Sequence, residues 1–478
     1  MVGLFASAFP LLIFALFASS PYLQTGPVAL TSLLTAGALL GAGLEPNTAD
    51  YIGAAALLAL IVGATRLLIG ATRLGSIVYL MAEPVTIGFT SGAGLVILGS
   101  QLSKALGVSL PADVATFDNP IRRALWALAH PGEWTIDAII FSAVTLSFMI
   151  IGRRLHRLFP GVLLAVVIAL LFSRITNYAG PVIDPVPSGL PTFTLDLPWA
   201  STGSLLAGGI VIALIGFAEP ASIARSFAGE SQSRWSSSRE FIASGFANLV
   251  AGATGAYPVG GSFARSSVNK IAGAETRWSG GITAVVMLIF LPFAFVLDGL
   301  PDAVLGAVVI GAVLSLVKPR RLWSFRKRSP YHASLAYITF LATLISPPNI
   351  HYAVLVGIAL TFVLHLTRPF HLEATASDDG SLGLRPRGLL WAGTNTRLGR
   401  ELAQAIEADT GAGLVTVSLD RSTAIDAATG AAIAMGQESA VRAGRDFAVS
   451  NTPRGGEVIL GGLGVPVLVD DELWEAPK

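Results

Sequence analysis

The sequence predicts a polytopic α-helical membrane protein with a small α/β domain at its C-terminal end. Hydrophobic residues make up 53% of the 478 residues and charged residues only 13%, whereas a soluble domain carries about 25% charged residues. Mean hydropathy is +0.67, and long apolar runs recur throughout residues 1–370. After Pro369 the composition changes to alternating apolar and polar residues. This charge deficit indicates that much of the surface faces lipid.

The apolar runs give about thirteen candidate membrane segments, where a full crossing takes about 20 residues. They lie near 3–18, 27–41, 50–68, 75–105, 134–152, 160–176, 204–224, 240–258, 262–273, 278–299, 303–317, 331–346 and 350–367. Two are too short to cross alone: 27–41 follows Gly26-Pro27, and 262–273 follows Gly260-Gly261.

Charge separates the loops between these segments into two sets. Basic residues dominate alternate loops, namely Arg66 and Arg73, then Arg153, Arg154 and Arg157, then Arg225, Arg234 and Arg239, and finally the run Lys318–Arg328. The intervening loops are mainly acidic. Because basic loops stay in the cytoplasm, we expect this set, and the C-terminal region with it, to be cytoplasmic.

The region after the last membrane segment is expected to contain a linker over 371–382 and a soluble domain over 383–478. Within that domain, alternation predicts strands, and the 3.6-residue spacing of Leu398, Leu402 and Ile406 predicts an amphipathic helix. The expected strands are 388–392, 413–419, 447–450, 457–460 and 465–469, and the expected helices are 395–408 and 424–443.

Several motifs resemble those of one transporter family. They are Gly3-Leu4-Phe5-Ala6-Ser7-Ala8-Phe9-Pro10, Gly26-Pro27-Val28-Ala29, Glu83-Pro84-Val85 with Gly88-Phe89-Thr90-Ser91-Gly92, Pro258-Val259-Gly260-Gly261-Ser262-Phe263-Ala264-Arg265-Ser266, and the alternating C-terminal domain. Together they resemble the SulP anion permeases, solute carrier family 26, whose C-terminal domain is a STAS domain.

The resemblance implies inverted seven-span repeats that form a core bundle and a gate bundle, with the third span of each repeat a half-helix. The two short segments match those half-helices. Counted this way the chain has six plus seven spans, so we expect that the family's first span is absent here. The resemblance also implies an inner-membrane homodimer with a cytoplasmic STAS domain.

Two half-helices that begin inside the membrane predict an anion site. Their N-termini carry unpaired backbone N–H groups and a partial positive charge, and discontinuous helices hold substrate near the midplane in this way. The expected site residues are Gly26, Pro27, Val28 and Ala29 on one side, and Ser262, Phe263, Ala264 and Arg265 on the other. The alternative is that these Gly and Pro residues only permit kinks and tight packing.

Within this site, Ser262 offers a hydroxyl donor and Arg265 a planar guanidinium suited to carboxylate or sulfate. Family members often carry a hydroxyl residue at the position of Ala264, which lacks that contact here. The alternative for Arg265 is a place at the cytoplasmic boundary, where its head group reaches water or pairs with a carboxylate.

Glu219 lies inside an apolar span, where a carboxylate is costly unless it is paired or protonated. We expect it to bind the proton that couples to anion entry; the alternative is a structural ion pair, for instance with Arg265. Asn248 and Asn269 are expected to form interhelical hydrogen bonds.

Other classes of function find little support. The chain has no cysteine, its six histidines lack metal-ligand spacing, and no phosphate-binding loop is present. We therefore expect no metal, no cofactor and no enzyme activity. A net charge of +1 gives no indication of a nucleic-acid partner.

The predicted function is secondary active transport of a small anion, such as sulfate, bicarbonate or a dicarboxylate such as fumarate, with proton-coupled symport by alternating access. One alternative is a nucleobase-type proton symporter of the same architecture, which would place carboxylates at its substrate. The other is a membrane-anchored STAS signalling scaffold without transport.

Overall fold

The structure is a computed structural model. It describes residues 2–46, 48–74, 83–115, 119–156, 158–186, 189–231, 235–328, 330–347, 349–367, 371–377, 380–387, 392–419, 427–452, 456–469 and 472–473. Two compact units can be distinguished. The larger comprises the described residues up to Leu322 together with Ala336–Gly357, and the smaller comprises those of Trp323–Leu335 and those from Ile358 onward. The division falls within the last apolar helix, whereas composition alone places the boundary at residue 370.

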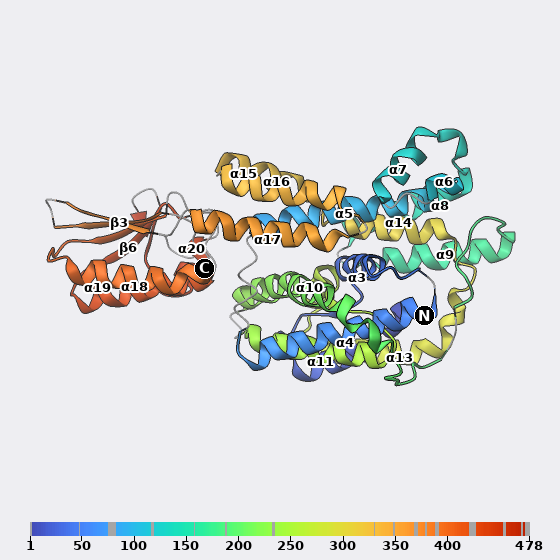
Figure 1. Cartoon of the computed structure of the whole chain (residues 1–478), viewed down its shortest axis with the longest axis horizontal. Helices are drawn as coiled ribbons and strands as arrows, with labels where there is room; N and C mark the ends of the chain where they lie inside the picture. Colours follow the sequence, from blue (N-terminus) through green and yellow to red (C-terminus); the bar gives the residue numbers. More distant parts are fainter. Residues whose placement is uncertain are drawn as a thin grey trace. The chain divides into compact units, whose positions relative to one another are not determined.

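In the larger unit, a core bundle surrounds two short helices. Its long members are α2 (Phe9–Phe17), α4 (Ala49–Ala71), α10 (Thr202–Ser231), α11 (Ser237–Ala253) and α13 (Trp278–Phe290), with the short α1 (Val2–Phe5) before them and η4 (Leu291–Leu297) after them. Small residues allow α4 and α11 to lie side by side (Figure 1). A Cβ atom at Gly63 would lie 2.7 Å from the backbone nitrogen of Leu249. Such close approach is typical of helix pairs in membranes.

The gate bundle contains the remaining apolar helices. They are α5 (Glu83–Leu106), α8 (Ile136–Leu155), α9 (Gly161–Thr176), α14 (Asp302–Val313), α16 (Pro330–Ile345) and α17 (Ile350–Thr367). Shorter helices accompany it: α6 (Ala112–Ala115), α7 (Pro120–Ala129), η2 (Pro131–Glu133) and α15 (Pro319–Arg328). The short η3 (Trp199–Ser201) instead leads directly into α10 of the core bundle. On α5, Gly88 and Gly92 face α16, where a Cβ atom at Gly92 would lie 2.8 Å from Thr343 Cβ.

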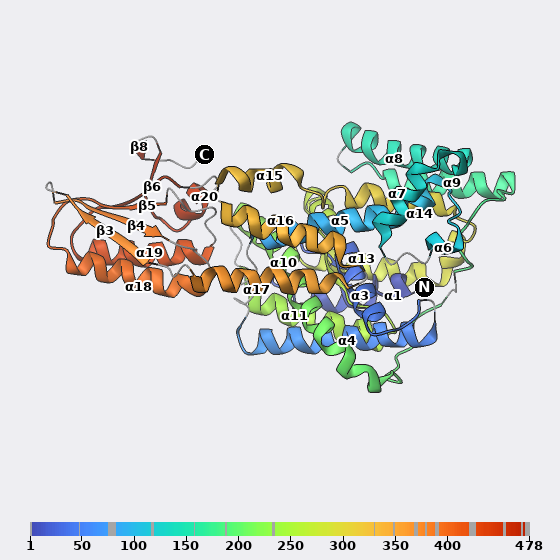
Figure 2. The same cartoon turned by 45° about the horizontal axis from the view of Figure 1, so that its top comes forward.

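Both half-helices are present in the core bundle. They are α3 (Ala29–Gly41), labelled in Figure 2, and α12 (Phe263–Ile271), preceded by the two-residue strands β1 (Thr25–Gly26) and β2 (Gly260–Gly261). The two strands pair antiparallel, as expected for corresponding parts of inverted repeats.

Each of the thirteen predicted segments contains a described helix. By length and composition, four described stretches can cross a membrane as continuous helices, namely Ala49–Ala71, Pro84–Leu106, Trp199–Ala221 and Trp278–Leu297. The fold class predicted from the sequence, a helical membrane protein of inverted repeats with a small α/β domain, is thus confirmed.

The smaller unit contains a six-stranded sheet in the order β3-β4-β5-β6-β7-β8. The strands are β3 (His371–Ala376), β4 (Leu382–Arg387), β5 (Val415–Ser418), β6 (Phe447–Ser450), β7 (Val467–Val469) and β8 (Glu472–Leu473), and the helices are α18 (Ala392–Ala408), α19 (Ala427–Arg442) and α20 (Gly456–Gly461). β4 to β7 are parallel, so helices connect them. Leu398, Leu402 and Ile406 are fully buried, which confirms the predicted apolar face.

Three predictions for this region need correction. Residues 371–376 of the expected linker form β3, which pairs antiparallel with β4, because a polar hairpin strand at a sheet edge resembles a linker in composition. Residues 456–461 form α20 rather than a strand, because one helical turn and one short strand show the same apolar run. Of the strand expected over 388–392, residues 388–391 lie outside the described residues, and Ala392 begins α18.

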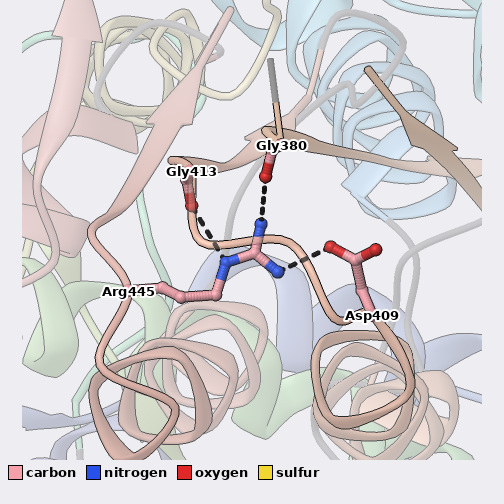
Figure 3. Close-up of polar contacts among 4 residues, drawn as sticks. All are labelled: Gly380, Asp409, Gly413 and Arg445. Atoms are coloured by element: carbon pink, nitrogen blue, oxygen red, sulfur yellow. Dashed lines mark hydrogen bonds and ion pairs between the residues drawn. The ribbon is translucent and has the colours of Figure 1, made fainter. Parts of the chain in front are cut away.

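Arg445 holds together the ends of three chain segments in the smaller unit (Figure 3). Its guanidinium donates to Asp409 Oδ2 over 2.6 Å, to the Gly413 carbonyl over 2.9 Å and to the Gly380 carbonyl over 3.0 Å. The residue is only 4% exposed, so these bonds replace almost all of its contact with water. Loss of the guanidinium would leave two carbonyls and a carboxylate without their donor.

We therefore predict that Arg445→Met destabilises the C-terminal domain by about 3 kcal/mol, the cost of removing one partner from a buried charged network. Hydrogen exchange at β5 and β6 in the purified full chain measures the loss. Arg442→Met on α19 is the matched control, because Arg442 is exposed and its Nε donates only to the Glu438 carbonyl. Equal protection in the two variants would contradict the prediction.

Candidate functional site

The two half-helices meet through the pairing of β1 with β2, in which Thr25 lies opposite Gly261 and Gly26 opposite Gly260. Gly26 has φ +148°, a backbone conformation that side chains rarely permit. A Cβ atom at Gly261 would lie 2.9 Å from Pro220 of α10. Glycine is therefore required where the strands pack against each other and against α10.

Each half-helix presents unpaired backbone donors at its start. Val28 and Ser262 are the N-cap residues of α3 and α12. The N–H groups of Ala29, Leu30, Phe263 and Ala264 have no hydrogen-bond partner among the described residues. Ala29 is partly exposed and Phe263 and Ala264 are exposed, so three of these donors lie at an accessible surface of the core bundle, whereas Leu30 is only 3% exposed. Such donors and the helix dipole favour an anion.

The side chain of Arg265 links the two half-helices. It comes from the first turn of α12, and its Nη2 donates to the Pro27 carbonyl over 3.0 Å. A Cβ atom at Gly26 would lie 2.9 Å from Arg265 Nη1, so only glycine leaves room for this guanidinium. The structure places Arg265 across the start of α3, and its remaining donors can bind an anion there.

Ser262 caps α12 with its hydroxyl oxygen, which accepts from the backbone nitrogen of Arg265 over 3.4 Å. A capping hydroxyl accepts one bond and keeps its own proton for another acceptor. The predicted residues from 26 to 29 and from 262 to 265 therefore come together at one place. This arrangement was predicted from the two short segments together with the family resemblance that identified them as half-helices.

Hydrogen bonds from the surrounding segments fix the strands in place. Gln24 accepts from the Ser262 backbone nitrogen over 2.9 Å and donates its own backbone N–H to Ser266 Oγ over 2.9 Å. Asn248 binds both the N–H and the carbonyl of Val259, the residue before β2. Asn269 donates to Tyr22 and to Ser279. The expected interhelical bond is confirmed for Asn269, which reaches Ser279 of α13, whereas Asn248 bonds to its own helix and to the extended segment before β2.

Glu219 lies on α10 directly before Pro220, the residue that packs against Gly261. It is partly exposed, and it forms no hydrogen bond or ion pair within the described part of the chain. The alternative of an ion pair with Arg265 is therefore not seen. Glu219 therefore lies next to the contact between Pro220 and β2, but it is not part of the start of either half-helix.

Sequence reasoning missed two buried charges of the core bundle. Arg66 was counted with a basic loop although it falls inside the predicted segment 50–68, and it is 0% exposed within α4. Glu240 is also 0% exposed, and its Oε2 accepts from the backbone nitrogens of Ser19 and Ser20, which begin the extended segment leading to β1. The only signal was that each charge falls at or near the end of an apolar helix.

The chemistry available at this site is anion binding by backbone dipoles and one guanidinium. Among the described residues no group of three His, Asp or Glu side chains is placed to hold a metal ion. The donors of the site are instead those that oxyanions prefer.

Comparisons with known proteins identify the family of the chain. The family model described as Sulfate permease family matches residues 1–339. The chloroplastic sulfate transporter 4.1 of Arabidopsis thaliana is 32% identical over 87% of this chain and 60% of its own length. A probable sulfate transporter of Mycobacterium tuberculosis is 31% identical over 80% of this chain and 67% of its own length. The chain thus spans about 60% of the length of several curated relatives that it matches.

Solved structures show the same fold. The structure of SLC26A9 covers 97% of this chain and 82% of its own length, with a TM-score of 0.70 and 17% identity. The transmembrane domain of the cyanobacterial bicarbonate transporter BicA covers 75% of this chain and 89% of its own length, with a TM-score of 0.61 and 22% identity. These relatives are named as transporters, not as enzymes. The chain is a multi-pass membrane protein that belongs to the sulfate permease family, the SulP family with solute carrier family 26.

Proposed function

We propose that this chain is a secondary active transporter of small anions. The observation that carries the proposal is the paired start of α3 and α12, where four backbone N–H groups have no partner among the described residues and the guanidinium of Arg265 bridges the two helix starts. An anion bound there is held by dipoles fixed in the core bundle. Movement of this bundle against the gate bundle would expose the site to each side of the membrane in turn.

Among the possible cargoes, sulfate and bicarbonate have the strongest support, and a dicarboxylate such as fumarate shares their chemistry. The relatives named above are sulfate transporters, and a structural neighbour is a bicarbonate transporter. Each of these anions presents several oxygen atoms on a planar or tetrahedral group. A guanidinium and backbone N–H groups bind such oxygen atoms by charge-assisted hydrogen bonds. Ala264 offers no hydroxyl to the anion, which leaves the backbone donors, the Ser262 hydroxyl and Arg265 as the main contacts.

Proton coupling by Glu219 extends this proposal. The carboxylate comes directly before Pro220, which packs against β2, and it makes no direct ion pair with a described residue, although the charge of Lys318 acts on it. A proton on Glu219 would remove its repulsion of an incoming anion. Anion and proton would then enter together, which is symport.

We further propose an inner-membrane location with a cytoplasmic C-terminal domain, in a homodimer. The support is the basic composition of the segment Lys318–Arg328 and of the loop at Arg153 and Arg154, which favours the cytoplasmic side. The C-terminal sheet with its two long helices is consistent with a STAS domain. Its proposed role is assembly or folding rather than transport itself.

Of the two alternatives, the nucleobase-type symporter is disfavoured because a guanidinium, not a carboxylate, bridges the half-helices. The signalling scaffold would retain the fold without transport, and it is tested by the same measurements as transport.

We predict that Arg265→Ala weakens sulfate binding by about 10- to 100-fold, since a hydrogen bond to a charged group contributes about 1.5–3 kcal/mol. Binding is measured by calorimetry on the purified chain, and uptake in proteoliposomes should fall in parallel. Lys270→Gln is the matched control, because it removes a cation from the last turn of the same helix. Similar losses in both variants would mean that net charge, not this guanidinium, holds the anion.

We predict that Glu219→Gln retains anion uptake but no longer responds to an inward proton gradient, because glutamine mimics the protonated carboxyl permanently. Uptake of labelled sulfate and bicarbonate with and without the gradient measures this. Glu275→Gln, an exposed position, is the control and should respond as the wild type does. A proton response that survives in Glu219→Gln would exclude this residue as the coupling group.

A further inference from the structure

Arg66 is a buried cation that the proposed transport mechanism has not used. Its guanidinium donates from Nε to the Ala213 carbonyl over 3.1 Å and from Nη2 to the Ile212 carbonyl over 3.2 Å. From Nη1 it donates to Ser244 Oγ over 2.8 Å and to the Val259 carbonyl over 3.0 Å. All four acceptors are neutral, and Arg66 forms no ion pair with any described residue.

A buried charge of this kind is unfavourable for folding unless it is well hydrogen-bonded, and it is usually paired with an opposite charge. Here the residue is 0% exposed, so neither water nor a carboxylate among its described contacts cancels the charge. The four hydrogen bonds offset the loss of solvation. They leave the full positive charge in place, in surroundings where a charge is weakly screened.

The charge of Arg66 lies directly behind the paired strands. A Cβ atom at Gly216 would be 2.8 Å from Arg66 Nη2 and 2.9 Å from Thr31 Cγ2. A Cβ atom at Gly260, in β2, would in turn be 3.1 Å from the same Thr31 atom and 3.5 Å from the Gly216 carbonyl. Val259, which accepts from Arg66, is the residue before Gly260. One layer of backbone thus separates this cation from the strands that carry the half-helices.

We propose that Arg66 is a fixed positive charge that sets the preference of the anion site for divalent over monovalent anions. This inference rests on the proposed anion site and names which anions it favours. Arg265 reaches the accessible surface and can contact the anion, whereas Arg66 is enclosed and acts through its field. It is a positioning residue: none of the described carboxylates pairs with it directly, and the buried Glu240, one turn from Ser244 on α11, binds Ser19 and Ser20 instead.

The charge dependence of this effect distinguishes it from a purely structural role. The energy of an anion in a fixed field is proportional to the anion's charge. Neutralising Arg66 should therefore lower the logarithm of the binding constant about twice as much for a dianion as for a monoanion of the same shape. A structural clamp that fails would instead distort the site for both anions alike.

Sulfate and perchlorate are suitable probes because both are tetrahedral but differ in charge. We would measure the binding of each to the purified full chain carrying Ser244→Asp, which sets a carboxylate beside Arg66 Nη1, and Ser244→Asn, which has the same size without the charge. We expect Ser244→Asp to lower the affinity for perchlorate about 10-fold and the affinity for sulfate about 100-fold. Ser244→Asn should leave the ratio of the two affinities as in the wild type.

Arg66→Gln provides a second test of the same charge and should lower the ratio in the same direction, while Arg66→Lys keeps the cation and most of the ratio. Equal weakening of both anions in Ser244→Asp and Arg66→Gln would overturn the inference and leave Arg66 as a structural clamp. A wild-type chain that bound neither anion would overturn the proposed function, and this inference with it.

Discussion

Inside a bilayer no water is available to satisfy a broken helix, so every free backbone group there needs a partner within the protein. The chain meets this constraint at one place by pairing two residues of one extended segment with two of another, Thr25 with Gly261 and Gly26 with Gly260. The pairing also fixes the orientation of the backbone groups at the starts of α3 and α12 that it leaves without a hydrogen bond. The packing of α10, the caps of α3 and α12 and the reach of Arg265 all depend on this pairing.

The pairing also explains why glycine residues recur around the two strands. Gly26 leaves room for the guanidinium of Arg265, Gly261 for Pro220, and Gly216 for Arg66. These three positions bring two cations and a proline-bearing helix against the same pair of strands. The result is a region of positive potential that comes mostly from backbone dipoles and can attract an anion. An anion that binds there does not have to break a carboxylate–guanidinium pair, so binding stays reversible.

Apolar length and glycine or proline spacing predicted the helices and both half-helices, because these signals are local in the sequence. Placement of single charges was not predictable in the same way. Arg66 was counted with a basic loop and Glu240 stood at the start of a predicted segment, and neither position indicated burial, because their partners come from segments up to 221 positions away. The strand at 371–376 was missed because its stability comes from pairing with β4 rather than from its own composition.

The central claim is that a small anion binds where α3 and α12 begin, and locating a bound anion tests it most directly. Crystals of the purified chain grown with selenate, a sulfate analogue that scatters anomalously, would show its position. The account predicts one anomalous peak within hydrogen-bonding distance of the backbone nitrogens of Phe263 and Ala264 and of the Arg265 guanidinium. A fully occupied selenate elsewhere in the membrane part, with this position empty, would contradict it.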